Sequence, residues 1–230
     1  MGGKIDAYLD CVSPYSYFAL LYLLKNRDTL ASHGIDVEFY PVFLGGINVG
    51  SGNKPPWTLP AKAGYSAFDN KRAKAYFDCP NIKTPDFFPI LSLLLLMICQ
   101  PQRCMAYVKA TFPQEKYEAS FRELFVAMWE QGLDLSKPEL MADALSRHFS
   151  HDEVKRIIES ANSAEYKKKL SDNTQKALDL GAFGCPWFWV RNDKGEEEPF
   201  FGSDRFHYMW RYLGIPFNDI QIQEKGNAKL

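Results

Sequence analysis

Two serines lie three residues apart in the segment Ser13-Pro14-Tyr15-Ser16, between an apolar strand-like segment and an apolar helix-like segment. Ser13 is a typical N-cap residue, and Pro14 fits the first helical position because its missing N–H would have no partner there. The N–H groups and the dipole of a helix N-terminus stabilise a negative charge placed against them. The Ser13 hydroxyl is therefore placed to hold an anion, such as the thiolate of a bound thiol compound. A simple helix cap is the alternative for this segment taken alone.

Three other segments occur in an informative order and spacing: Ser51-Gly52-Asn53-Lys54-Pro55-Pro56, Gly181-Ala182-Phe183-Gly184-Cys185-Pro186 and Phe200-Phe201-Gly202-Ser203-Asp204-Arg205. Together with the first segment they resemble the kappa class of glutathione transferases over nearly the whole chain. Serines stand where related thiol oxidoreductases carry Cys-Pro-Tyr-Cys, so a disulfide cannot form there. The chain is similar, more loosely, to bacterial 2-hydroxychromene-2-carboxylate isomerases, which share the fold and the use of glutathione.

This resemblance implies a glutathione site that begins at Ser13, Pro14 and Tyr15. Ser13 would donate a hydrogen bond to the sulfur and favour its ionised form. Lowering a thiol pKa by about two units takes roughly 2.7 kcal/mol, which a charge-assisted hydrogen bond and a helix terminus can supply. The peptide bond between Cys185 and Pro186 is expected to be cis, and the backbone of Cys185 is expected to pair with the cysteinyl backbone of glutathione.

The ends of the tripeptide are assigned by the same resemblance. Asn53 and Lys62 would serve one end. Ser203 and Asp204 are predicted to open a helix over Arg205–Leu213, so that its N–H groups bind the γ-glutamyl carboxylate and the Asp204 side chain accepts from the ammonium. Capping explains Ser203 and Asp204 equally well when each is taken alone, and a solvated charge explains Lys62.

The resemblance implies an enzyme that adds glutathione to small electrophiles or reduces hydroperoxides. A glutathione-dependent cis-trans isomerase is the first alternative, because the same thiolate can add reversibly to a conjugated ketone. A catalytically idle thioredoxin-like binding module is the second, and the exchange of cysteine for serine would suit it. Trp57 and Trp187 flank the family segments and are candidates to line the electrophile pocket. Cys11 and Cys185 leave open a residual thiol-disulfide chemistry.

The elements that position these residues predict an α/β fold. Alternation and apolar runs indicate strands at Lys4–Leu9 and Val37–Phe43, joined by a helix over Tyr17–Leu24 into a parallel β-α-β unit. Sheet returns as a hairpin of Trp187–Val190 and Pro199–Phe201. The fold class predicted is a thioredoxin-like sheet domain with an inserted all-helical domain, as in DsbA.

The predicted domains are a discontinuous thioredoxin-like domain (1–58 and 178–222), an inserted helical domain (59–177) and a tail (223–230). Capping-box patterns at Ser136 with Glu139 and at Ser150 with Glu153 mark helix starts in the insertion. The most apolar run, Phe87–Cys99, contains a proline and is too short for a membrane span, so it is predicted to be a buried helix.

Composition indicates an ordinary enzyme without nucleic-acid or membrane partners. The chain has 27 basic and 28 acidic residues and a net charge of −1, which gives no field to attract nucleic acid or anionic lipid. Five irregularly spaced cysteines argue against a disulfide framework and a zinc site. The ending Ala228-Lys229-Leu230 approximates a peroxisomal address, with mitochondrion or cytoplasm as alternatives. The resemblance also implies a homodimer.

Overall fold

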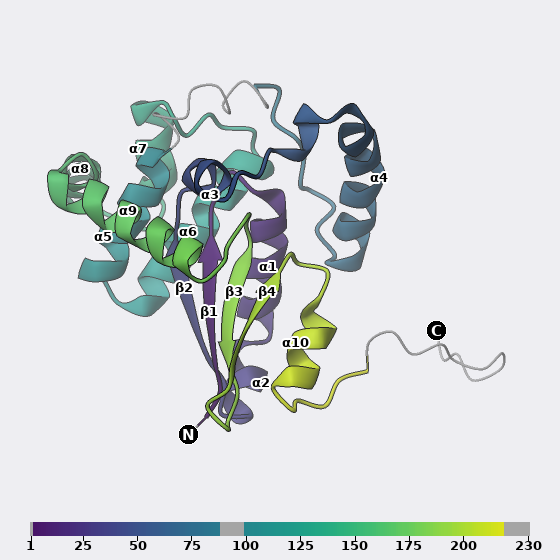
Figure 1. Cartoon of the computed structure of the whole chain (residues 1–230). Coiled ribbons are helices and arrows are strands. Elements are labelled where there is room, and N and C mark those ends of the chain that lie inside the picture. Colours follow the sequence, from purple (N-terminus) through teal and green to yellow (C-terminus); the bar gives the residue numbers. More distant parts are fainter. Residues whose placement is uncertain (1, 88–98, 219–230) are drawn as a thin grey trace.

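A four-stranded sheet forms the centre of the computed structural model, which describes residues 2–87 and 99–218 (Figure 1). The strand order is β2-β1-β3-β4. Strand β1 pairs in parallel with β2 and antiparallel with β3, and β4 continues the antiparallel hairpin. The strands are β1 (Lys4–Leu9), β2 (Asp36–Pro41), β3 (Trp187–Arg191) and β4 (Glu197–Phe201). The predicted β-α-β unit and hairpin are both present, and the α/β fold class is confirmed.

The second strand ends earlier than the sequence predicts. It stops at Pro41, and Phe43 is the N-cap of an unpredicted helix, α3 (Leu44–Ser51). Three glycines in α3 lower its helix propensity, which explains why the sequence pattern did not reveal it. Tertiary hydrogen bonds hold its start: the Leu44 N–H donates to the Asp10 carboxylate (2.7 Å), and the Phe43 N–H donates to the Thr174 hydroxyl (3.0 Å).

The sheet buries apolar side chains on both faces because successive residues of β1 point to opposite sides. Ile5, Ala7 and Leu9 belong to the larger core. Tyr8 belongs to a smaller core beside α3 and α9 (Ala164–Asp179). The larger core includes residues of α1 (Pro14–Lys25), α6 (Gln114–Trp129) and the final helix α10 (Phe206–Tyr212). Figure 1 shows α1 and α10 beside the sheet, with α9 passing near its upper end.

Between α3 and β3, every regular element in the described residues is a helix, which confirms the predicted helical insertion. Figure 1 shows α4 apart from the cluster formed by α5 to α9. The exact domain boundaries stay a prediction. The helices described between α3 and β3 are η1 (Pro56–Thr58), α4 (Pro60–Tyr76), α5 (Cys99–Thr111), α6 (Gln114–Trp129), α7 (Pro138–Ser146), α8 (His151–Ala161) and α9 (Ala164–Asp179). Outside this segment, the short helix α2 (Arg27–Ser32) follows α1.

One of the two predicted capping boxes is present. Ser150 accepts from the Glu153 N–H, and the Glu153 carboxylate accepts from the Ser150 N–H (2.8 Å). The prediction at Ser136 is wrong, because Lys137 is the N-cap of α7 and the Ser136 hydroxyl donates to Asp134 instead (2.6 Å). The reason is local competition, since a carboxylate two residues earlier is the stronger acceptor.

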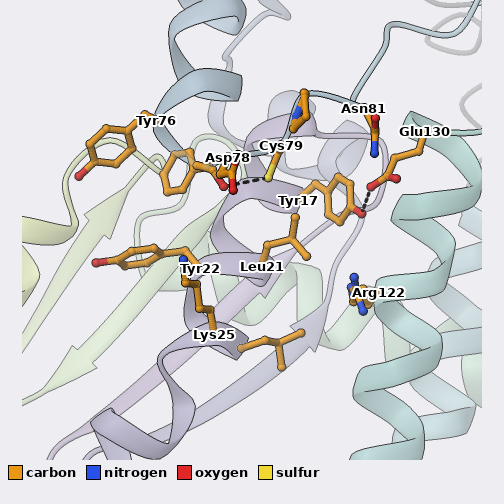
Figure 2. Close-up of a pocket in the computed structure, with 13 residues that line it drawn as sticks. Tyr17, Leu21, Tyr22, Lys25, Tyr76, Asp78, Cys79, Asn81, Arg122 and Glu130 are labelled. Carbon is orange, nitrogen blue, oxygen red and sulfur yellow. Dashed lines mark hydrogen bonds between the residues drawn. The ribbon is translucent and has the colours of Figure 1, made fainter. Parts of the chain in front are cut away.

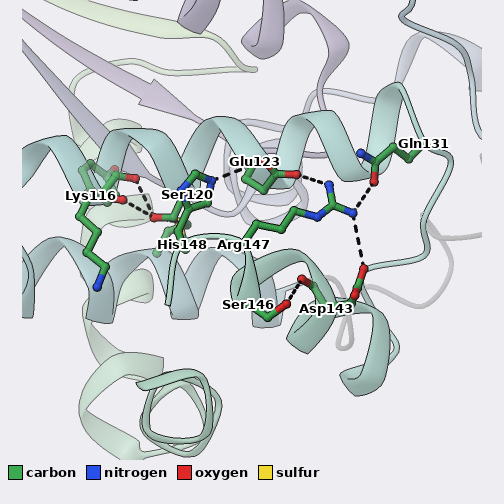
Figure 3. Close-up of polar contacts among 10 residues, drawn as sticks. Lys116, Ser120, Glu123, Gln131, Asp143, Ser146, Arg147 and His148 are labelled. Atoms are coloured by element: carbon green, nitrogen blue, oxygen red, sulfur yellow. Dashed lines mark hydrogen bonds and ion pairs between the residues drawn. The ribbon is translucent and has the colours of Figure 1, made fainter. Parts of the chain in front are cut away.

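An arginine at the end of α7 connects this helix to α6 (Figure 3). The guanidinium of Arg147 donates to the carboxylate of Glu123, to the side-chain oxygen of Gln131 (2.8 Å) and to Asp143 (3.4 Å). No helix in the described ranges is long and apolar enough to cross a bilayer. Most of the predicted buried helix over Phe87–Cys99 lies outside the described residues.

Candidate functional site

A cavity of about 720 Å³ brings together six of the nine residues predicted to form the site. Its wall comes from the start of α1, from α3 and the following loop, from α4, and from the loop before β3. The predicted residues that line it are Ser13, Pro14, Tyr15, Asn53, Lys62 and Cys185. Residues that are 172 positions apart in the chain therefore meet at one opening, since the Ser13 hydroxyl contacts Cys185.

Ser13 is the N-cap of α1, as predicted, and Pro14 is the first residue of that helix. The Ser13 Oγ accepts a hydrogen bond from the Ser16 N–H (3.2 Å) and donates its own proton to the Cys185 carbonyl (3.1 Å). The residue is 4% exposed. Its one proton can be redirected to a ligand atom by rotation about a single bond, without moving the backbone.

The peptide bond between Cys185 and Pro186 is cis, as predicted. Pro186 does not line the cavity, but its carbonyl accepts from the Gly202 N–H (3.1 Å) and thereby ties this loop to the end of β4. The thiols of Cys11 and Cys185 are buried, and burial raises the pKa of each well above its ordinary value. Both thiols therefore stay protonated at neutral pH, which disfavours thiol-disulfide exchange at this site.

A buried carboxylate beneath the Ser13 loop was missed by the sequence analysis. Asp10 is fully buried, and its oxygens accept from the Val12 N–H (3.2 Å), the Leu44 N–H (2.7 Å) and the Gln102 amide (2.8 Å). Burial raises the pKa of Asp10 to about 6 although these hydrogen bonds lower it. The available signal was an acidic residue at the end of an apolar strand, directly before the serine segment. Asp10 thus joins the loop before α1 to α3 and α5 at one point.

Tyr15 points its hydroxyl toward the helix that lies over the cavity. The hydroxyl donates to the Asp69 carboxylate of α4 (2.7 Å). Burial, and next the hydrogen bond to Asp69, raise the pKa of Tyr15. The phenol therefore remains protonated, and it donates its proton to Asp69. Ser13 is then the cavity-lining residue at the start of α1 whose hydroxyl proton can turn toward a ligand. The sequence pattern did not identify Asp69, because nothing in a helical repeat marks which polar residue faces α1.

The loop that carries Asn53 is fixed across the cavity mouth. The Asn53 Nδ2 donates to the Phe183 carbonyl (2.6 Å), and its Oδ1 accepts from the Lys54 N–H (2.8 Å). Gly52 ends α3 with a φ of 74°, a conformation that glycine adopts without strain. Lys62 is exposed on the first turn of α4 and lines the same cavity. These two predicted residues therefore lie on neighbouring walls.

The last helix begins one residue later than predicted, and the predicted capping by Ser203 and Asp204 is wrong. Helix α10 begins at Phe206 with Arg205 in the N-cap position, and no side chain caps it. Asp204 is exposed and pairs with the Arg205 guanidinium (3.0 Å), while Ser203 is buried in the turn before the helix. Gly202, at a φ of 85°, turns the chain after β4 and delays the helix. Neither Ser203 nor Asp204 lines the cavity, although the negative charge of Asp204 acts on the Tyr15 hydroxyl.

Of the two tryptophans predicted to line the cavity, Trp57 does so and Trp187 does not. Trp187 is buried in the smaller core and packs edge-on against Phe183 (5.4 Å between ring centroids). Trp129, which the sequence analysis missed, also lines the cavity, and its indole N–H donates to the Cys11 carbonyl (2.7 Å). The cavity therefore combines a polar end at Ser13 with aromatic walls at Trp57 and Trp129.

A second cavity of about 660 Å³ lies on another flank of α1, as Figure 2 shows. Tyr17 lines this cavity, and its hydroxyl donates to the Glu130 carboxylate (2.6 Å). Lys25, Arg122 and Cys79 also line it. It contains none of the predicted site residues. In the described part of the chain, no group of three or more His, Cys, Asp or Glu residues is arranged to hold a metal ion.

Comparisons with known proteins identify the family and agree with the fold. A family model described as a DSBA-like thioredoxin domain matches residues 4–214. The chain is 31% identical to glutathione S-transferase kappa 1 of Caenorhabditis elegans, over 93% of this chain and 92% of that protein. It is 28% identical to the human protein of the same name, over 91% and 90%. A solved 2-hydroxychromene-2-carboxylate isomerase has a similar fold, with a TM-score of 0.69, 19% identity and coverage of 92% and 94%.

Proposed function

The chain belongs to the DSBA-like thioredoxin domain family, among the kappa glutathione S-transferases, and we propose that it transfers glutathione to small electrophiles with Ser13 as the thiolate-stabilising residue. One observation carries the role of Ser13. Its hydroxyl caps α1, faces the 720 Å³ cavity, and donates a proton that a single rotation can redirect. The names of the relatives support glutathione as the co-substrate.

Glutathione binding would exchange two hydrogen bonds at the start of α1. The hydroxyl of Ser13 now donates to the Cys185 carbonyl (3.1 Å). When the glutathione sulfur arrives beside Ser13, the hydroxyl turns to the sulfur and the Cys185 carbonyl accepts from the cysteinyl N–H of the ligand instead. No acceptor is left unpaired by this exchange. The ionised sulfur is the better acceptor, so the exchange itself favours the thiolate.

The thiolate then attacks the electrophile, which we place under α4 and between the aromatic walls. The sulfur forms a bond to the electrophilic carbon, and the leaving group departs with the bonding electron pair. With a hydroperoxide the thiolate attacks an oxygen, the O–O bond breaks and the alcohol leaves, so that glutathione becomes a sulfenic acid. A second glutathione thiol then attacks the sulfenic sulfur, which releases water and forms the disulfide. Trp57, Trp129 and the loop after α3 line this half of the cavity. A role in detoxification follows from this chemistry.

The binding test of this proposal uses glutathione and its S-methyl derivative on the purified protein. We expect both to bind, and we expect only reduced glutathione to release a proton at neutral pH. Conjugation of an aryl halide should follow. If neither compound binds, the proposal fails and a catalytically idle binding module becomes the better description.

An isomerase is the second candidate function, favoured by the fold similarity to 2-hydroxychromene-2-carboxylate isomerase. The same Ser13-bound thiolate would add to a conjugated ketone, allow rotation about the resulting single bond and leave again. A panel of aryl halides, hydroperoxides and hydroxychromene carboxylates separates the two activities. Turnover of the carboxylates without net consumption of glutathione would identify the isomerase.

Replacing Asn53 by alanine is expected to weaken glutathione binding about tenfold. The side chain makes two hydrogen bonds, one to the Phe183 carbonyl and one from the Lys54 N–H. Each stabilises the ordered conformation of the loop by about 1 kcal/mol. Titration calorimetry measures the change, with Asn48→Ala, a variant of another asparagine that lines the cavity, as the matched control. Equal effects of the two variants would contradict a special role for Asn53.

The predicted homodimer and the predicted peroxisomal location belong to this proposal as well. The exposed aromatic side chains Tyr65, Phe68 and Tyr76 support an interface on α4. Light scattering of the full chain tests the dimer. The Ala-Lys-Leu ending lies outside the described residues, and its use as an address stays a prediction that imaging of the chain with and without these three residues would check.

A further inference from the structure

Helix α4 covers the cavity without being anchored by an apolar face. None of its 17 residues is buried, and Gly64 in its interior lowers its intrinsic stability. Most helices in proteins are stabilised mainly by packing an amphipathic face, and in α4 the apolar contribution is small: the half-buried Ala73, near its C-terminal end, packs against the larger core. Its position over the site must therefore depend on a small number of specific contacts.

The two faces of α4 differ in a way that points to the site. Ser66, Asp69 and Asn70 are half-buried on the side of the cavity, and Ser66 and Asn70 line it. Tyr65 and Phe68 are exposed on the other side. The polar face of α4 is thus turned inward. Beyond its C-terminal end, Phe77 stacks on Phe18 of α1 (5.3 Å between ring centroids), so this end of the helix is fixed.

The middle of α4 is joined to α1 by the hydrogen bond from the Tyr15 hydroxyl to the Asp69 carboxylate (2.7 Å). Tyr15 lies two residues after Ser13, in the first turn of α1. An ionised acceptor makes this bond stronger than one between neutral groups. The hydrogen bond between Tyr15 and Asp69 therefore sets the distance between the Ser13 hydroxyl and the polar face of α4.

We propose that Asp69 is a positioning residue whose hydrogen bond to Tyr15 holds α4 over the cavity and shapes the half of the site that receives the electrophile. This inference rests on the proposed function and adds the part of the protein that fixes the second substrate. Asp69 acts through Tyr15 and the helix, and it takes no part in ionising the thiol. Loss of the bond should therefore weaken electrophile binding while the thiol pKa stays unchanged.

The experiment compares Asp69→Ala, Asp69→Asn, Tyr15→Phe and the double variant Tyr15→Phe/Asp69→Ala in the full chain. Asp69→Ala removes the acceptor, Tyr15→Phe removes only the donor, and Asp69→Asn keeps an acceptor. We expect the KM for an aryl halide to rise about tenfold in the alanine and phenylalanine variants, which corresponds to about 1.4 kcal/mol. The double variant should be no worse than either single one. Asp69→Asn should recover most of the loss.

Two further readouts distinguish this positioning role from a direct role of Asp69 in ionising the thiol and from a general loss of stability. The thiol pKa of bound glutathione should be equal in the wild-type protein, Asp69→Ala and Asp69→Asn. Amide hydrogen exchange of residues 60–76, measured without glutathione, should be faster in Asp69→Ala and Tyr15→Phe and unchanged in the control Asp86→Ala, whose carboxylate is exposed.

If exchange and KM do not change, or if Asp69→Asn is as impaired as Asp69→Ala, the proposal is overturned. If glutathione does not ionise in the wild-type protein, the proposed function fails, and the exchange experiment still decides whether the bond holds α4.

Discussion

Replacing Ser13 by alanine is expected to raise the pKa of bound glutathione by one to two units and to slow conjugation about 10- to 100-fold at neutral pH. The Ser13 hydroxyl is the donor at the start of α1 that faces the cavity with a movable proton. Without it, the helix terminus alone stabilises the thiolate, and a smaller fraction of the thiol is ionised. The ultraviolet absorbance of the thiolate, followed as a function of pH, measures this pKa directly.

Ser16→Ala is the matched control for this experiment. The Ser16 hydroxyl is fully buried and has no hydrogen-bond partner among the described residues. Its N–H still donates to Ser13 in the control, so the cap of α1 is kept. The thiol pKa should therefore be that of the wild-type protein. An equal shift in both variants would show that disturbance of the helix, rather than loss of the Ser13 donor, is the cause.

Ser13→Ala also removes a helix cap, and this effect must be separated from catalysis. An N-cap serine replaced by alanine typically costs about 1 kcal/mol of stability. That loss should appear in urea denaturation and should leave the protein folded at room temperature. Ser13→Gly is useful here, because glycine at an N-cap costs only a few tenths of a kcal/mol and still removes the hydroxyl. Both variants should show the same rise in the thiol pKa.

The sequence predicted the frame of the site because its signals are local. The alternation in Lys4–Leu9, the cap at Ser13 and the hairpin predicted from Trp187–Val190 and Pro199–Phe201 depend on neighbouring residues, and each appears in the structure. Helix propensity did not predict α3, because its glycines disfavour a helix. Hydrogen bonds to Asp10 and Thr174 hold the start of this helix in the structure. Those partners are distant in the chain, so no local pattern could reveal them.

The same distinction explains the site. Ser13, Asn53 and Cys185 were found because they stand in recognisable segments, and the structure brings them to one cavity. Asp69 and Asp10 were missed because their importance comes from tertiary contacts, with Tyr15 in one case and with three donors in the other. The helix predicted over Arg205–Leu213 begins one residue later, at Phe206, and neither Ser203 nor Asp204 caps it, because the chain turns at Gly202 in a way that a pattern of capping residues does not show.

Asp10 supplies the second large effect. Replacing it by alanine leaves the Val12 N–H, the Leu44 N–H and the Gln102 amide without their acceptor in a region from which water is excluded. Loss of a buried group with several hydrogen bonds typically costs about 3 kcal/mol or more. We therefore expect the free energy of unfolding in urea to fall by at least this amount. We also expect the start of α3 to become disordered.

The ionisation of Asp10 gives this prediction a pH dependence with a definite sign. Burial raises its pKa in the folded protein from 3.8 to about 6, so the folded state binds this proton more tightly than the unfolded state does. The resulting stabilisation is fully present below pH 3.8 and is lost as the pH rises through about 6. This contribution to the unfolding free energy should therefore decrease by about 3 kcal/mol across that window.

Asp10→Asn isolates the effect, because asparagine keeps an acceptor of similar size and does not titrate. The decrease in unfolding free energy across this window should be smaller in Asp10→Asn than in the wild-type protein and in the control Asp193→Asn, whose carboxylate is exposed in the β3–β4 turn. Urea denaturation at several pH values between 3.8 and about 6 measures it. An unchanged slope in Asp10→Asn would mean that Asp10 is already ionised at the lower end of this range, and that its hydrogen bonds outweigh the cost of burying its charge. At neutral pH, above the pKa of about 6, Asp10 is mostly ionised in either case, so Ser13 lies above a negative charge that opposes a thiolate and requires more of the stabilisation to come from the Ser13 hydroxyl.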